Sequence, residues 1–225
     1  MPGLSELFKL LQDYPNTLSL SAHTHNQWQA FFGKADGWMQ NKPHHHYNVG
    51  TTSGNWYSGE FDEKGVPVTT MSDGTPKGYA FIRFTGNQYV RDYKVAGKPA
   101  DYRIGLWLPK VIERNTRGQY GVFANFFMGH KDDKMKYRID GKKWQPMTFR
   151  EDHDPAYINA LFKWDTSDTL IAGTRRPSFP NQSRHLWWAR LDNNLPVGEH
   201  IVEVRATDMF GRAFIQQAKY RIEER

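Results

Sequence analysis

The sequence predicts a mostly β protein, in which a C-terminal antiparallel β-sandwich follows a short α/β segment. From about residue 56 onward, short runs of alternating polar and apolar residues are separated by Gly, Pro, Asn and Asp. Only one helical stretch, near residues 155–162, interrupts these runs. Before residue 56, an amphipathic stretch precedes an alternating one, which is typical of a helix that leads into a strand.

The individual elements follow from local patterns. Apolar residues recur at helical spacing from Leu4 to Leu11, and Pro15 ends this helix. Residues 17–22 then alternate as a strand. The dipeptide Asp140-Gly141 is a strong hairpin-turn signal. The strands expected in the sandwich cover residues 78–84, 102–108, 121–127, 135–139, 200–206 and 214–222.

We place the boundary between the two parts near residues 56–60, so that residues 1–56 and 57–225 form separate domains. Residues 50–59 are rich in Gly and Ser but are too few to act as a free linker. We therefore expect the two parts to touch. Trp56 and Tyr57 are expected to pack at this junction, because large aromatic side chains bury much area.

Composition excludes several classes of protein. A hydrophobic content of 38% with 15% aromatic residues is sufficient for a packed core and is not that of a disordered chain. The absence of cysteine excludes disulfides, zinc-thiolate sites and cysteine nucleophiles. No stretch approaches the ~20 apolar residues that a membrane-spanning helix needs.

The net charge of +6 comes entirely from residues beyond 56, where basic and aromatic side chains are mixed. Such a mixture can bind single-stranded nucleic acid by phosphate neutralisation and base stacking. We favour a solvated surface around core tryptophans, and nucleic acid is not expected as a partner. The residues concerned are Arg175, Arg176, Arg184 and Arg190 with Phe179, Trp187 and Trp188.

Two histidines follow the first expected strand. Residues 19–26 read Ser-Leu-Ser-Ala-His-Thr-His-Asn, so His23 and His25 would project from one face of an extended backbone. Neutral imidazole is a common ligand of transition metals. His23 and His25 are therefore candidate metal ligands, although a solvated strand end would show the same spacing.

A second cluster, His44-His45-His46, follows Pro43. In a strand only His44 and His46 share a face, and His45 points the opposite way. His44, His46 and Asn26 are candidates to support the metal ligands or to contact a substrate phosphate. An exposed strand edge is the alternative interpretation of this cluster.

Several segments together resemble one known family. Residues 21–25, Ser-Ala-His-Thr-His, resemble the Gly-His-x-His motif of calcineurin-like metallophosphoesterases, with Ala22 in place of the usual glycine. Other segments resemble the C-terminal region of a bacterial subfamily of these enzymes, and they occur in the same order. These segments are residues 48–60, 71–79, 137–141, 198–200 and 206–211.

The resemblance implies two-metal hydrolysis of a phosphoester, in which two divalent ions hold the phosphoryl oxygens and activate a bridging water. In that scheme His23 coordinates one metal and His25 the other. The family's earlier motifs, Asp-x-His, Gly-Asp-x-x-Asp and Gly-Asn-His, do not occur in this sequence. We therefore expect the C-terminal portion of a larger enzyme, which alone binds no metal ion, or one weakly, and is inactive.

The same resemblance implies a phosphoester substrate and suggests a periplasmic or exported location, which the residues themselves leave open. Partners could include the missing catalytic part or a second copy of the chain. The alternative is a non-catalytic sandwich that binds or scaffolds, through a glycan, an envelope surface or a protein contact. An exposed row of tryptophans would favour a glycan platform, whereas their burial would favour scaffolding. The tryptophans concerned are Trp56, Trp107, Trp187 and Trp188.

Overall fold

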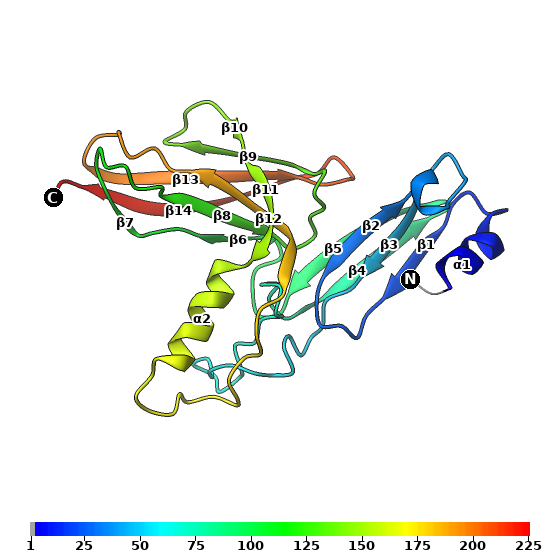
Figure 1. The fold of residues 1–225 in the computed structure, drawn as a ribbon, viewed down its shortest axis with the longest axis horizontal. Coiled ribbons are helices and arrows are strands. Elements are labelled where there is room, and N and C mark those ends of the chain that lie inside the picture. The colour runs from blue at the N-terminus through cyan, green and yellow to red at the C-terminus, as the bar shows by residue number, and fades with distance from the viewer. Residues whose placement is uncertain (1–2) are drawn as a thin grey trace.

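The computed structural model describes residues 3–225, and within that range it contains four β-sheets, two α-helices and one short 3-10 helix (Figure 1). The expectation of a mostly β protein is confirmed. Three groups of strands follow one another along the chain: a small sheet near the N-terminus, a hairpin, and a two-sheet sandwich.

The N-terminal part is a three-stranded sheet with a helix beside it. Helix α1 (Leu4–Leu11) leads into β1 (Leu18–Ser21), which pairs in parallel with β3 (His44–Asn48). Strand β2 (Trp28–Phe32) pairs with the other edge of β3 in antiparallel direction, and the 3-10 helix η1 (Lys34–Asp36) follows β2. The expected helix and first strand are confirmed. Strand β2 was not expected, because its sequence, Trp-Gln-Ala-Phe-Phe, does not alternate.

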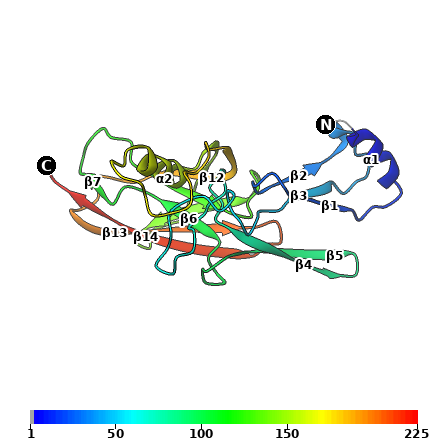
Figure 2. The ribbon, with the colours of Figure 1, turned by 90° about the horizontal axis from the view of Figure 1, so that it is seen from below.

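A two-stranded hairpin extends alongside this sheet (Figure 2). It consists of β4 (Gly78–Thr85) and β5 (Gln88–Val95) in antiparallel pairing. The Arg91 guanidinium of β5 lies 4.5 Å from the centroid of the Tyr47 ring in β3. This cation–π contact fastens the hairpin to the N-terminal sheet.

The remaining strands form a five-stranded sheet, in the order β10-β9-β13-β14-β7, and a four-stranded sheet, in the order β11-β12-β8-β6. All neighbours in these sheets are antiparallel except β14 and β7. The bounds are β6 (Ile104–Trp107), β7 (Val111–Glu113), β8 (Gly121–Phe126), β9 (Lys134–Ile139), β10 (Gln145–Pro146), β11 (Thr148–His153), β12 (Gln182–Arg190), β13 (Gly198–Thr207) and β14 (Ala213–Glu223).

The core lies between these two sheets. Val202 and Val204 of β13 are fully buried in one apolar cluster with Val122 and Ala124 of β8 and Trp187 of β12. Fully burying a side chain the size of valine contributes about 1.5–3 kcal/mol relative to leaving it exposed. The expected sandwich is therefore confirmed, and loops and helix α2 surround it.

One residue, Asp154, separates the end of β11 from helix α2 (Pro155–Asp165). Its N-cap Asp154 accepts a hydrogen bond from the Tyr157 backbone N–H, and Pro155 occupies the first helical position. The helix expected near residues 155–162 is confirmed. Neither α1 nor α2 is long and apolar enough to cross a membrane, and the rest of the described chain has no helix that is.

Three segments of the sandwich that resemble the phosphoesterase family, residues 137–141, 198–200 and 206–211, form turns or hold these turns in place by side-chain contacts. Asp140 and Gly141 have φ of 51° and 70°, which confirms the expected turn after β9. Asp140 Oδ2 lies 2.6 Å from His200 Nδ1 of β13. Asp208 accepts hydrogen bonds of 2.9 Å from the backbone N–H groups of Phe210 and Arg212 in the turn between β13 and β14.

Candidate functional site

The two candidate metal ligands lie in a bend directly after β1. The strand ends at Ser21, and His23 and His25 have φ of 80° and 53°. The expectation of an extended backbone at these residues is therefore wrong. The physical reason is a local anchor: Asn48 Nδ2 donates to Thr24 Oγ1 at 2.8 Å and to the Asn26 carbonyl at 2.6 Å, which turns the chain. A left-handed backbone at a non-glycine residue costs about 1–3 kcal/mol, and such strain is concentrated at functional sites.

His25 is half-buried and its ring is held in one orientation. Its Nδ1 lies 2.7 Å from the Gly54 carbonyl oxygen, which only accepts, so Nδ1 donates and Nε2 keeps its lone pair. The ring stacks on Trp56 with a centroid distance of 4.1 Å and an interplanar angle of 13°. Histidines that bind metals usually donate their second ring N–H to a carbonyl or carboxylate. The geometry of His25 thus fits a ligand that binds through Nε2. His23 is exposed in the same bend.

The loop beside His25 carries two exposed aromatic residues. Trp56 and Tyr57 are 57% and 50% exposed, so the expectation that they are packed in the junction is wrong. Both have left-handed backbones, with φ of 57° and 54°, because residues 53–58 form a tight turn in which the Tyr57 N–H donates to the Ser53 carbonyl at 2.8 Å. Arg175 Nη2 donates to the Trp56 carbonyl at 3.3 Å, which places a positive charge beside this loop.

His44 and His46 alternate with hydroxyl groups of β1 on one face of the sheet. Ser19 Oγ lies 2.8 Å from His44 Nε2 and 2.7 Å from His46 Nδ1. The parallel register pairs Ser19 with His46, so the polar positions of both strands share a face. The expectation that His44 and His46 share a face is confirmed. We call this row the Ser-His ladder, and it comprises Thr17, Ser19, Ser21, His44, His46 and Asn48.

The Ser-His ladder ends at the bend that holds the candidate ligands. Ser21 Oγ donates to Asn48 Oδ1 at 2.7 Å, and the same Asn48 side chain anchors Thr24 and Asn26. The ladder thereby connects the buried interior of the small sheet to His23 and His25. A supporting role for His44 and His46 stays a prediction, for which this hydrogen-bonded connection supplies a physical route.

His45 lies on the opposite face of β3, against the hairpin. Its Nε2 is 3.0 Å from Gln29 Oε1, and its Nδ1 is hydrogen-bonded to the Tyr89 hydroxyl. Burial and the nearby positive charge of Arg91 lower the pKa of His45 to about 3. Burial also lowers the pKa of His44 and of His46. The three rings are therefore held in the neutral form.

We expect acid to destabilise the fold through His45. Its pKa falls from 6.5 when unfolded to about 3 when folded, so the unfolded chain binds the proton first. This part of the stability is complete above pH 6.5 and is lost as the pH falls toward 3, by about 1.4 kcal/mol per pH unit. Urea unfolding at several pH values gives the free energy of unfolding as a function of pH. Between pH 3 and 6.5 this free energy should fall less steeply with acid in His45→Gln than in the parent chain. The exposed His153→Gln is the control, and an equal pH dependence in both variants would contradict a role for His45 in acid destabilisation.

Asn26 joins the bend to the C-terminal part. Its Oδ1 accepts hydrogen bonds from Ser72 Oγ at 3.0 Å and from Asn181 Nδ2 at 3.2 Å. The next residue, Gln27, donates its backbone N–H to Asp73 Oδ2 at 2.6 Å. The expectation that the two parts touch is therefore confirmed. A polar pocket of about 380 Å³ lies at this contact, and it is lined by Asn26, Gln27, Trp28, Asp73, Glu151, Asn181, Gln182 and Arg184.

A fully buried polar network continues from Asp73 into the sandwich. Asp73 accepts from the Thr75 N–H at 2.9 Å and lies 3.4 Å from His185 Nε2. His185 Nδ1 is 2.7 Å from Asn125 Oδ1, and Asn125 Nδ2 donates to Asp154 Oδ2 at 2.8 Å. The sequence gives His185 no neighbouring motif that would mark it as part of a site. The available signal was Asn125, a polar residue inside the otherwise apolar strand β8.

The basic and aromatic residues near β12 are mostly engaged within the fold. Arg176 pairs with Asp165 at 2.5 Å, and Arg184 lies 3.6 Å from Glu151. Trp187 is 2% exposed, whereas Trp107 is 36% exposed. The tryptophans thus form neither a continuous exposed row nor a fully buried set.

The described residues bring together no group of three or more His, Cys, Asp or Glu side chains that could hold a metal ion. His23 and His25 are therefore at most two ligands of a site, and their metal binding stays a prediction. Their fit to that role rests on the tautomer of His25 and on the strained bend.

A family model and a solved structure are similar to this chain. A superoxide reductase (neelaredoxin) from Ignicoccus hospitalis is similar over 54% of this chain and 81% of its own, with a TM-score of 0.29 and 6% identity, which is too loose for any inference. None of the curated proteins matches. The model of the family described as the C-terminal region of calcineurin-like phosphoesterases matches residues 46–214, a range that begins after His23 and His25. The chain therefore belongs to the family of C-terminal regions of calcineurin-like phosphoesterases.

Proposed function

We propose that this chain contributes the last two metal ligands, His23 and His25, to a phosphoester-hydrolysing centre of the calcineurin-like type. Family membership supports the reaction class. The observation that carries the proposal is the hydrogen bond of 2.7 Å from His25 Nδ1 to the Gly54 carbonyl, which leaves Nε2 available as a ligand. Stacking on Trp56 holds the ring in place.

Two divalent cations would supply Lewis acidity and an activated water at the phosphoryl group. The chain's own residues would orient the histidine ligands and attract the substrate. The Gly54 carbonyl holds the His25 tautomer, and the Asn48 side chain holds the bend. Arg175, bonded to the Trp56 carbonyl, adds a positive charge near the same loop, which favours an anionic phosphoester substrate.

The N-terminal sheet has an edge that suits the packing of further polypeptide. Strand β1 is an edge strand, whose free backbone groups can pair with another strand. Apolar side chains lie open on both sides of this edge: Leu7 and Leu10 of α1 are 38% and 70% exposed, and Leu20, on the opposite face of the sheet, is 52% exposed. We propose that the rest of a catalytic domain packs along this edge and supplies the carboxylates that two histidines lack. A bacterial source and a periplasmic or exported location belong to this proposal through resemblance alone.

We expect the chain alone to hydrolyse no appreciable p-nitrophenyl phosphate in the presence of manganese, because two imidazoles cannot neutralise two dications. Manganese titration should detect at most one weak site, lost in His25→Ala and retained in the exposed control His153→Ala. Reconstitution with a segment encoded upstream of Met1 that carries Asp-x-His and Gly-Asn-His should restore turnover. Turnover that survives His25→Ala, in the chain alone or reconstituted, would refute the proposal.

A non-catalytic binding or scaffolding role is the second candidate function. One observation favours it: the family match covers residues 46–214, which include most of the sandwich but not the histidine bend. Under this interpretation His25→Ala leaves function intact, and reconstitution with an upstream segment yields no histidine-dependent activity. The reconstitution experiment therefore separates the two candidates.

A further inference from the structure

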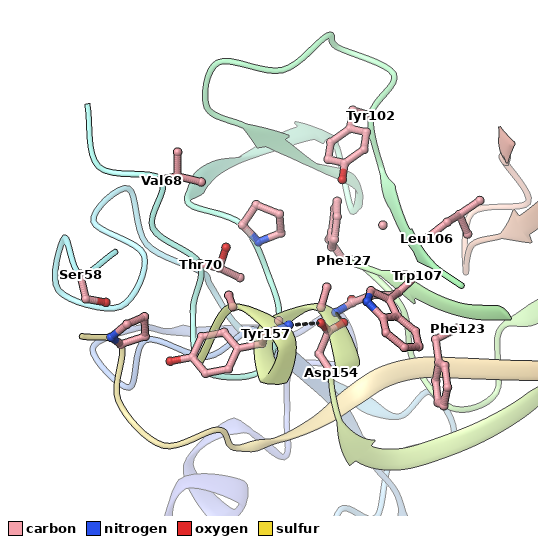
Figure 3. Close-up of a pocket in the computed structure, with 17 residues that line it drawn as sticks. Ser58, Val68, Thr70, Tyr102, Leu106, Trp107, Phe123, Phe127, Asp154 and Tyr157 are labelled. Carbon is pink, nitrogen blue, oxygen red and sulfur yellow. Dashed lines mark hydrogen bonds between the residues drawn. The ribbon is translucent and has the colours of Figure 1, made fainter. Parts of the chain in front are cut away.

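A cavity of about 220 Å³ opens between helix α2, strands β6 and β8, and the segment that precedes β4 (Figure 3). Its rim includes Val68 and Trp107, which are 52% and 36% exposed, and its floor includes Phe127 and Asp154, which are 1% and 5% exposed. The volume lies just below the ~300 Å³ at which sites for drug-sized ligands begin. The cavity therefore has room for one small head group.

Aromatic rings supply much of the lining. Tyr102 and Phe127 form a tilted pair with centroids 5.5 Å apart, and Trp107 and Phe123 form an edge-to-face pair at 6.2 Å. In Figure 3, Asp154 lies between Tyr157 and Trp107, with Tyr102 and Phe127 across from it. Ring faces carry negative partial charge, so rings gathered in this way attract a cation that enters between them.

Asp154 is the charged side chain in this lining, which contains no Lys, Arg or His. Its carboxylate accepts from Asn125 Nδ2 at 2.8 Å and from the Tyr157 N–H at 2.9 Å, and both donors are neutral. Burial raises the pKa of this carboxyl group. The N-terminus of α2, which Asp154 caps, also stabilises this negative charge, but burial outweighs these contacts, because burying a charge is costly unless it is paired. A cation in the cavity would provide the missing charge, and an anion would be repelled.

Ser58 gives a second, independent indication of a ligand. It is 2% exposed and lines the cavity, and its Oγ has no hydrogen-bond partner among residues 3–225. Leaving a buried hydroxyl unpaired costs about 1–3 kcal/mol. In Figure 3 Ser58 lies beyond Tyr157, at the opposite end of the cavity from Asp154 and Trp107, so a polar ligand atom at that end would satisfy its oxygen.

We propose that this cavity binds a small organic cation of the alkylammonium type, with its charged head among the aromatic rings beside Asp154. The proposal does not depend on metal binding by His23 and His25. It concerns only the part of the chain that folds as the sandwich with α2.

The test uses the whole chain and calorimetric titration with choline and with 3,3-dimethylbutan-1-ol, its neutral isostere. We expect choline to bind at least about tenfold more tightly, since a desolvated cation–π contact alone is worth about 2 kcal/mol. Asp154→Asn, which keeps an N-cap acceptor for α2, should weaken choline binding about tenfold. Equal affinity for choline and the isostere, or no detectable choline binding, would overturn the proposal.

Two further variants keep the test valid if Asp154→Asn folds poorly. Trp107→Leu at the rim should weaken choline binding several-fold, whereas Trp144→Leu, outside the cavity, should not. Ser58→Ala should leave choline binding unchanged, because Ser58 lies at the opposite end of the cavity from Asp154 and Trp107. Choline affinity that is the same in Trp107→Leu as in the parent chain, or preferential binding of a neutral sugar such as methyl glucoside, would also overturn it.

Discussion

Asp73→Ala is expected to lower the free energy of unfolding by about 3–5 kcal/mol, the range observed when one partner of a buried charged network is removed. Asp73 is 2% exposed and accepts from the backbone N–H groups of Gln27 at 2.6 Å and Thr75 at 2.9 Å. Without the carboxylate, both N–H groups remain buried with no partner, and His185 Nε2 keeps only its contact of 3.2 Å with Thr75 Oγ1. Gln27 belongs to the N-terminal part, so the loss also loosens the contact between the two parts.

The control is Asp62→Ala. Asp62 Oδ1 also accepts from two backbone N–H groups, those of Lys64 and Val66, each at 2.9 Å, but the residue is exposed. Water replaces those bonds, so the expected cost is below about 1 kcal/mol. Urea unfolding followed by tryptophan fluorescence measures both variants. A similar loss in the two variants would show that burial of the Asp73 network is not what stabilises the junction.

Gly74→Ala is the second substitution with a large expected effect, at least about 3 kcal/mol. A Cβ at this position would lie 2.3 Å from Asp154 Cβ and 2.4 Å from Asp154 Cγ, and the backbone φ of +86° already disfavours alanine. Asp154 cannot move aside, because it caps α2 and holds Asn125. The substitution therefore disturbs the buried network and the floor of the cavity together.

Gly141→Ala isolates the steric part of this effect. Gly141 has a comparable φ of +70°, but a Cβ there would meet nothing within 4 Å. Its expected cost is the backbone strain alone, about 1 kcal/mol. Thermal or urea unfolding of both variants measures the difference. Equal costs would mean that Asp154 yields to the new methyl group, and the close approach of Gly74 would then have no energetic role.

Local patterns predicted much of this fold. The strands with clear alternation, such as β13 and β14, and the turn at Asp140-Gly141 were all found where the sequence indicated them. Strand β5 was missed because Arg91 occupies a core-facing position, which breaks the apolar alternation. Arg91 is 2% exposed and is compensated by Tyr47 and by the Met128 carbonyl, to which it donates at 2.8 Å. Strand β12 was not predicted as a strand; burial of its Trp187 agrees with the expectation of a solvated surface around core tryptophans, whereas the buried His185 carried no such expectation.

The candidate site was predicted in part. The two-residue alternation of side chains along a strand correctly predicted that His44 and His46 lie on one face. The identity of His23 and His25 as candidate ligands came from the sequence, but their backbone did not, because the strand is ended by a side chain from β3, Asn48, that lies 22–24 residues further along.

By itself, the sequence determined the mostly β class, the resemblance to the phosphoesterase family and the positions of most turns. These depend on neighbouring residues, since side-chain periodicity and left-handed turn positions are local properties. Only the tertiary structure decided the bend at His23 and His25, the buried network from Asp73 to Asp154 and the cavity beside it. Each of these joins residues that are far apart in the chain, Asp73 and His185 for example, and no local pattern encodes which distant polar groups will meet.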